Sequence, residues 1–259
     1  MILKKTAFAL MIFFLFFSAC SGNNEIKTIR DRGEICIGVN ADVPRFGWLN
    51  LANSELEGME IDLGRMMAKD ILDDENAVKF LIVGGAQTRA AMLENGEIDM
   101  AIATFSITEE RKKSFNFSRP YFTDEVGFLV RSDSNINNPQ DMDGKTAGVV
   151  RAATAKDAFE NECQKLNIYA NIFEYPNYPE IKEALVKDKI DIFVADKSII
   201  YGYIEEGFEL LDYGFSSQEY GIATKFANKK LAARADALLD RMEKNGDLSA
   251  ILKKWSLSK

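Results

Sequence analysis

Two charged side chains of opposite sign follow two strand-like runs of the sequence at corresponding positions. Arg111 comes shortly after the apolar run 100–103, and Asp196 directly follows the apolar run 192–195. A guanidinium binds a carboxylate through two parallel hydrogen bonds, and a carboxylate pairs with an ammonium group. Together the two side chains match the charged ends of an α-amino acid. Either residue alone is more often a solvated surface charge, so the prediction of a zwitterion site depends on the pairing.

Hydroxyl groups and backbone N–H groups accompany the arginine. Thr104 and Ser106 follow the first run, and Thr108 with the two glutamates after it is typical of the start of a helix. Free N–H groups near a helix start can hold an anion. We therefore expect a carboxylate to bind close to Ser106 and Arg111.

The elements that must position these residues occur twice. Residues 78–103 and 171–196 each contain a strand, a helix, a polar turn and a strand that begins with Ile-Asp and two apolar residues. One supersecondary unit used twice predicts two similar lobes. Ligands of open α/β lobes bind beyond the carboxyl ends of the strands. Arg111 and Asp196 are therefore expected to face each other across a cleft that closes around a ligand.

Strands and helices alternate through the whole chain. The strand-like runs are 34–40, 78–83, 100–103, 127–131, 146–150, 171–174, 192–195 and 221–224. Helical periodicity occurs in 61–71, 89–95, 155–166, 180–187, 197–205 and 231–255. Strands separated by helices predict an α/β protein with parallel strands covered on both faces.

Composition excludes several functions. The chain has 259 residues, with 40 Asp and Glu against 32 Lys and Arg, and it has no histidine. A Ser-His-Asp triad and a histidine-ligated zinc are therefore impossible within it, and we expect neither a metal nor a cofactor. The net charge of −8 argues against nucleic acid as a partner.

The first twenty residues are typical of an export signal. Lys4 and Lys5 precede an apolar run, 7–17, and then come Ser18, Ala19 and Cys20. The run is too short to span a bilayer, which takes about 20 residues, so residues 1–19 are expected to be a signal peptide.

The end of this signal resembles the cleavage box of bacterial lipoproteins, in which the cysteine carries lipid. This resemblance implies a lipid anchor on Cys20 and a polar tether over residues 20–27. The protein would then be exported and would face the periplasm or the cell exterior. The alternative is simple secretion, with Cys20 playing no part.

Two further cysteines remain in the mature chain. Cys36 lies in a strand-like run and Cys163 in a helical stretch. An exported protein can join such a pair in a disulfide, but two buried free thiols are the favoured interpretation.

Four motifs resemble the family 3 periplasmic solute-binding proteins, which are amino-acid receptors of ABC importers. They are 58–63 (GMEIDL), 106–111 (SITEER), 117–122 (FSRPYF) and 246–255. The resemblance extends from about residue 28 to residue 255. Five shorter motifs are similar to the branch that binds aspartate and glutamate, with cysteine receptors nearby: 88–89, 103–108, 152–154, 175–179 and 194–198.

The resemblance implies a type II periplasmic-binding-protein fold, often compared to a Venus flytrap. Two mixed sheets flanked by helices would be joined by a two-stranded hinge, with crossings near 123–127 and 217–221. Residues 28–125 plus 220–259 would form lobe I, and residues 126–219 would form lobe II. A monomer is expected.

The resemblance also implies a role for each matching residue. Arg111 would hold the α-carboxylate of the ligand, helped by the backbone N–H groups of Ser106 and Thr154. Asp196 would bind the α-ammonium, and Thr104 would add a polar contact.

Further positions concern the side chain of the ligand. Arg89 matches an arginine that reaches a side-chain carboxylate, and Tyr178 and Tyr220 match tyrosines near the pocket. Asn40 stands where the acidic branch commonly has lysine. Phe46, or else Trp48, would cover the ligand, because the usual aromatic residue is replaced by valine.

The expected function is thus capture of glutamate or aspartate and delivery to the membrane subunits of an ABC permease. Cysteine or another small polar amino acid remains an alternative ligand because Asn40 replaces a positive charge. An enzyme on the same fold, similar to a dehydratase, is the rival from another class. It would need a catalytic acid such as Glu174, Glu180 or Glu219, and nothing in the sequence places one at a reacting atom. An adhesive or antigenic role is left open.

Overall fold

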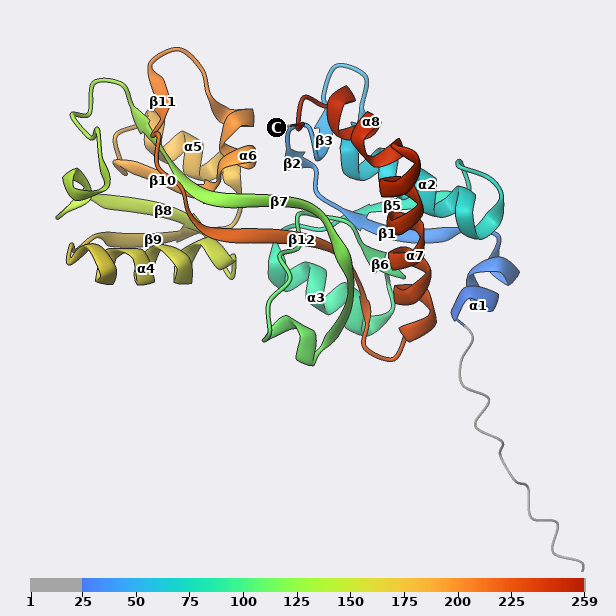
Figure 1. The fold of residues 1–259 in the computed structure, drawn as a ribbon. Helices are drawn as coiled ribbons and strands as arrows, with labels where there is room; N and C mark the ends of the chain where they lie inside the picture. Colours follow the sequence, from blue (N-terminus) through green and yellow to red (C-terminus); the bar gives the residue numbers. More distant parts are fainter. Residues whose placement is uncertain (1–24, 259) are drawn as a thin grey trace, which may run out of the picture.

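The computed structural model describes residues 25–258. The expected signal peptide, Cys20 and the first part of the expected tether lie outside these residues. Figure 1 shows two bodies side by side, connected by two long strands, β7 (Phe115–Arg131) and β12 (Phe215–Lys225). The α/β class and the two-stranded hinge are as expected.

The main sheet contains nine strands in one hydrogen-bonded ladder. Eight of them follow the order β5, β1, β6, β12, β7, β10, β8, β9, and β11 pairs with β7. Besides β7 and β12, the bounds are β1 (Ile35–Val39), β5 (Val78–Ile82), β6 (Met100–Ala101), β8 (Thr146–Val150), β9 (Asn171–Tyr175), β10 (Ile192–Asp196) and β11 (Phe208–Leu210). A separate sheet consists of β2 (Asp42–Val43), β3 (Gly47–Asn50) and β4 (Glu55–Glu57).

Strand direction explains why each body is mixed rather than wholly parallel. β1 is parallel to β5 and β6, and β8 is parallel to β9 and β10. The hinge strands β7 and β12 are antiparallel to each other and to their neighbours β10 and β6. Because the same two strands enter both bodies, the two expected sheets are continuous through the hinge.

Helices cover the faces of this ladder, as Figure 1 shows. Their bounds are α1 (Glu25–Arg32), α2 (Met59–Leu72), α3 (Ala86–Asn95), α4 (Thr154–Leu166), α5 (Tyr178–Val186), α6 (Lys197–Ile200), α7 (Lys229–Asn245) and α8 (Asp247–Lys254). Three short 3₁₀ turns are η1 (Arg111–Lys113), η2 (Pro139–Met142) and η3 (Tyr201–Tyr203). Among the helices of residues 25–258, none is long and apolar enough to cross a membrane.

Some boundaries differ from expectation. Residues 25–27, assigned to the tether, begin α1. The expected helix 231–255 is two helices, because Gly246 takes the left-handed conformation (φ 88°) that ends α7. No helix starts at Thr108; a turn and η1 follow it instead.

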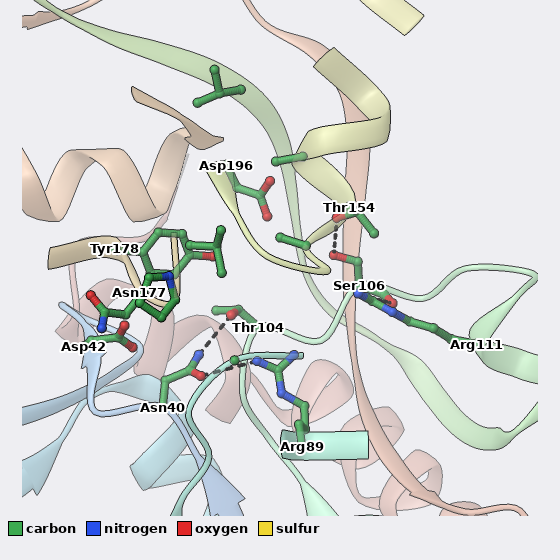
Figure 2. A pocket seen from close by; sticks show the side chains of 16 residues that line it. Asn40, Asp42, Arg89, Thr104, Ser106, Arg111, Thr154, Asn177, Tyr178 and Asp196 are labelled. Atoms are coloured by element: carbon green, nitrogen blue, oxygen red, sulfur yellow. Dashed lines mark hydrogen bonds between the residues drawn. The ribbon is translucent and has the colours of Figure 1, made fainter. Parts of the chain in front are cut away.

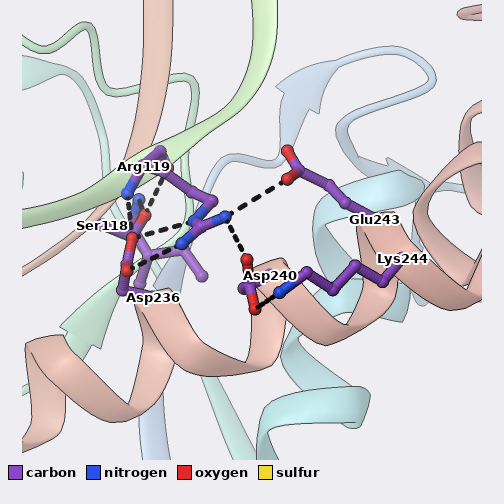
Figure 3. Close-up of polar contacts among 7 residues, drawn as sticks. Ser118, Arg119, Asp236, Asp240, Glu243 and Lys244 are labelled. Atoms are coloured by element: carbon purple, nitrogen blue, oxygen red, sulfur yellow. Dashed lines mark hydrogen bonds and ion pairs between the residues drawn. The ribbon is translucent and has the colours of Figure 1, made fainter.

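One end of the hinge is fastened to α7. The backbone N–H and guanidinium of Arg119 on β7 donate to Asp236, and the guanidinium also donates to Asp240 at 2.8 Å and to Glu243 at 3.3 Å (Figure 3). Lys244 pairs with Asp240 from the other side. Such a network holds its geometry better than an isolated surface pair.

Both described cysteines are unpaired. Cys163 is buried in α4, and Cys36 is half-buried in β1. Burial raises the pKa of each thiol.

Candidate ligand-binding site

A cavity lies between the two bodies, where the carboxyl ends of strands from both meet (Figure 2). Eight of the ten expected ligand-binding residues line it. These are Asn40, Arg89, Thr104, Ser106, Arg111, Thr154, Tyr178 and Asp196. The chain segments that contribute them are far apart in the sequence, and the hinge brings them together.

Arg111 begins η1, where its backbone N–H donates to the Thr108 hydroxyl at 3.1 Å. Its guanidinium donates to the carbonyl of Ser106 at 2.8 Å and lies 4.4 Å from the centroid of the Phe105 ring. Burial, followed by the nearby charge of Arg89, lowers the pKa of Arg111 to about 10. The side chain is therefore positively charged at neutral pH and held in place for an anion.

Two hydroxyl groups meet across the cavity beside Arg111. Ser106 Oγ and Thr154 Oγ1 lie 3.3 Å apart, and Thr154 also donates to Gln218 at 2.8 Å. Thr154 is the first residue of α4, whose N–H groups and dipole favour a negative charge there. This end of the cavity offers positive charge and hydrogen-bond donors to a carboxylate.

Asp196 provides the opposite charge. It ends β10, and its side chain is 6% exposed. The hydroxyl of Tyr220 donates to its carboxylate. Burial raises the pKa of Asp196 to about 7, with a further contribution from the charge of Asp124.

A third group of side chains forms the floor of the cavity. Asn40 donates to Thr104 Oγ1 at 2.9 Å and accepts from Arg89 at 3.4 Å (Figure 2). The Arg89 guanidinium lies 4.7 Å from the centroid of the Phe105 ring, and its buried Nε has no partner within the described residues. Burial lowers the pKa of Arg89. A ligand acceptor at this point would meet an arginine with little competition from water.

The backbone of Thr104 is strained. Its φ of 43° is unusual for a β-branched residue. Its N–H donates to the carboxylate of Glu60, which is fully buried and also accepts from Tyr121. Glu60 thus fixes the turn that presents Thr104 to the cavity.

Sequence reasoning missed two polar residues of the lining, Asp42 and Asn177. Figure 2 shows both beside Tyr178, at the side of the cavity away from Arg111. Asp42 follows β1 by three residues, so the strand-end rule that found Asp196 could have found it as well. Asn177 caps α5 by accepting from Glu180 at 2.9 Å.

The expectation for Phe46 is corrected, and Tyr220 lies deeper than expected. Phe46 is fully buried and packs edge-on against Phe122 at 5.2 Å and Tyr220 at 5.9 Å, so it belongs to the core and does not line the cavity. Its position in the turn before β3 directs an apolar ring inward. Tyr220 is fully buried as well and contacts the cavity through Asp196.

Comparison with known proteins shows to which family this chain belongs. The sequence profile of the bacterial extracellular solute-binding proteins, family 3, matches residues 35–258. The chain belongs to this family. The solute-binding protein is 35% identical over 239 residues to the ABC transporter glutamine-binding protein GlnH of Bacillus subtilis (strain 168), covering 91% of this chain and 85% of the relative.

Two further comparisons agree. A glutamine-binding protein of Geobacillus stearothermophilus is 36% identical over 206 residues, covering 79% of this solute-binding protein and 77% of the relative. A solved structure described as an ancestral arginine-binding protein bound to glutamine superposes with a TM-score of 0.77 at 29% identity, covering 88% of this chain and 99% of that one. The two-lobed architecture is therefore shared with solved amino-acid-binding proteins.

Proposed function

We propose that this solute-binding protein captures a free amino acid between its lobes and delivers it to the membrane subunits of an ABC importer. The observation that carries the proposal is that Arg111 and Asp196, contributed by different bodies, line one cavity. Removing a zwitterion from water leaves two charges that must each find a partner. The arginine and the aspartate supply both partners when the cleft is closed, so the ligand favours the closed state.

The remaining lining residues favour glutamine as the ligand. Arg89 offers a donor from the floor of the cavity, and Asp42 offers an acceptor on the side away from Arg111. A side-chain carboxamide has one acceptor oxygen and one donor NH₂ group, and it can satisfy both residues without a net charge. The relatives named as glutamine-binding proteins support the same choice.

Glutamate is the second candidate, because a carboxylate would also pair with Arg89. It would then lie near the Asp42 carboxylate, and like charges in a desolvated cavity repel strongly. This repulsion makes the acidic ligand expected from the sequence less favourable than glutamine. Asp42 is thus the residue on which the choice depends.

Titration calorimetry on the purified mature protein tests the proposal. L-glutamine, L-glutamate, L-aspartate, L-arginine and L-cystine would be titrated separately, and we expect the tightest binding for L-glutamine. Arg111→Ala and Asp196→Ala should each abolish binding while thermal unfolding stays cooperative. Unchanged affinity in either variant, or no binding of any amino acid by the unaltered protein, would overturn the proposal.

A second experiment on the purified protein distinguishes a receptor from an enzyme. We propose that it leaves its ligand unaltered. In the binding proposed above, Arg111 and Asp196 pair with the charged ends of the amino acid, and no proton is transferred to the ligand. Mass spectrometry of the ligand recovered after prolonged incubation should show an unchanged mass. A converted product would favour the dehydratase-like alternative.

Export and anchoring belong to the same proposal. A receptor that serves an importer must meet its ligand outside the cytoplasmic membrane, and a lipid on Cys20 would keep it there. Mass spectrometry of the N-terminal peptide from the native host, with Cys20→Ser as the comparison, should show a diacylglyceryl addition that the variant lacks.

A further inference from the structure

Two carboxylates and one tyrosine meet below the cavity, where the hinge joins the second body. Asp196 lies at the end of β10, Asp124 on β7 and Tyr220 on β12. The Tyr220 hydroxyl contacts Asp196 and lies 3.5 Å from Asp124 Oδ2. A phenol has one hydrogen to donate, so it cannot satisfy both carboxylates at once.

Hydrogen-bond donors are divided unequally between the two acids. Asp124 accepts from the backbone N–H and the hydroxyl of Ser198, and from the N–H of Glu125 at 2.8 Å. Asp196 accepts from Tyr220, and within residues 25–258 no backbone N–H donates to its carboxylate. Donors stabilise the ionised form of an acid. Burial raises the pKa of both acids, but at Asp124 three donated hydrogen bonds oppose the rise, whereas at Asp196 a single hydrogen bond and the charge of Arg111 oppose it. The negative charge therefore belongs on Asp124, and the proton belongs on Asp196.

The charged and titratable groups around Asp196 favour the same distribution. Asp124 and Tyr220 approach it from the hinge, while Tyr178 of α5 and Arg111 of η1 act on it from farther away. Burial and the charge of Asp124 raise its pKa, and the contributions of Tyr220 and Arg111 that oppose this rise are smaller. Before ligand binds, no cation in the described residues forms an ion pair with Asp196.

We propose that Asp124 is a positioning residue that keeps Asp196 protonated in the empty site, so that the ligand ammonium displaces one proton when it binds. This inference rests on the proposed capture of an amino acid. In the exchange, the O–H bond of the Asp196 carboxyl breaks, its proton passes to solvent, and the resulting carboxylate pairs with the ammonium. Charge is balanced, because one cation leaves the cluster as another enters.

The direction of the pH dependence follows from this exchange. Below the pKa of Asp196 in the empty site, binding must expel a proton, and each further unit of acid lowers the affinity by about tenfold. Above that pKa the carboxylate is already ionised, and the affinity becomes independent of pH. A neutral ligand would show no such dependence, because it does not replace the proton's charge.

Calorimetric titration of L-glutamine in two buffers of different ionisation enthalpy measures the protons released. We expect nearly one proton per ligand at about pH 6 and close to none at about pH 8.5. If another amino acid binds more tightly, it serves as the probe, because the α-ammonium group is common to all. No binding at the higher pH would contradict the proposed function, whereas tight binding without proton release would overturn only this inference.

Two variants should move the midpoint of proton release in opposite directions. Asp124→Asn removes the charge that holds the proton and should lower the midpoint by about one pH unit. Tyr220→Phe removes the donor that stabilises ionised Asp196 and should raise it by about as much. A residue that only supported the fold would change stability and leave the midpoint in place.

The exposed Asp133 supplies the matched control, since Asp133→Asn removes the same charge from the protein surface, outside the cluster. It should release protons as the unaltered protein does. Equal midpoints in Asp124→Asn, Tyr220→Phe and the control would show that the cluster does not hold the proton.

Discussion

The guanidinium of Arg111 lies over the ring of Phe105, 4.4 Å from its centroid. Arg89 approaches the same ring at 4.7 Å. The two arginines repel each other, and the charge of Arg89 is one of the causes that lower the pKa of Arg111. An aromatic face stabilises a nearby cation, so Phe105 helps to keep two like charges in one small cavity.

Replacing this ring should weaken binding without altering any charge. Phe105→Leu removes the cation–π contact of both arginines, and we expect affinity for the amino acid to fall by about 3- to 30-fold. Phe117→Leu is the matched control, because Phe117 packs against Phe105 at 5.4 Å within the same core. Calorimetry should show a much smaller loss of affinity for the control. Equal losses would assign the effect to packing alone.

Asp42 should decide between an amide and a carboxylate on the ligand side chain. In Asp42→Asn the acceptor for the ligand NH₂ group loses its charge, so glutamine should bind about tenfold more weakly. Glutamate should bind more tightly, because the opposing charge is gone. Competition binding with both amino acids measures the ratio, and Asp212→Asn at the surface serves as the control. A ratio that stays the same would remove Asp42 from the specificity of the site.

Glu60 should make the stability of the protein depend on pH. Burial raises the pKa of its carboxyl from 4.5 to about 7. The folded protein therefore holds this proton more tightly than the unfolded chain does. Stability must then fall as pH rises from about 4.5 to about 7, and it changes little through this group outside that window.

The variant Glu60→Gln isolates the effect, because its amide oxygen can still accept from Thr104 and Tyr121. We expect the unaltered protein to lose about 1–3 kcal/mol more than the variant across this interval. Urea unfolding of both proteins at several pH values measures the difference. Parallel curves would show that Glu60 does not titrate within the interval.

Much of the cavity lining could be predicted from the sequence, because ligands of α/β lobes bind beyond the carboxyl ends of the strands. Arg111 and Asp196 come after repeated strand–helix units, and parallel strands bring the residues at their carboxyl ends to one edge of the sheet. Asp42 was missed although it follows the recognised strand β1 by three residues, because it lies in the short strand β2 and not directly at the strand end as Asp196 does. Phe46 was expected to cover the ligand because valine replaces the aromatic residue that is usual in the family, but the direction of its ring depends on packing that no local pattern records.

Buried acids were harder to recognise. Glu60 lies at the start of α2, where an acidic residue is ordinary because of the helix dipole. Asp124 lies in a strand whose alternation places it half-exposed. Only the close approach of Thr104, Tyr121 and Tyr220 shows that these carboxylates meet other polar groups, and such contacts depend on tertiary structure.

The fastening of β7 to α7 has a mechanical consequence. Arg119 holds β7 to α7 at the edge of the first body through its hydrogen bonds and ion pairs with Asp236 and Asp240. Any rotation of the second body must therefore be taken up between Pro120 and Val126, which is the stretch that contains Asp124. The segment that bends is thus also the one that carries Asp124, the residue proposed to keep the proton on Asp196. A membrane partner that binds α7 would contact a part of the protein that stays in place. It would detect a bound ligand as a displacement of the second body.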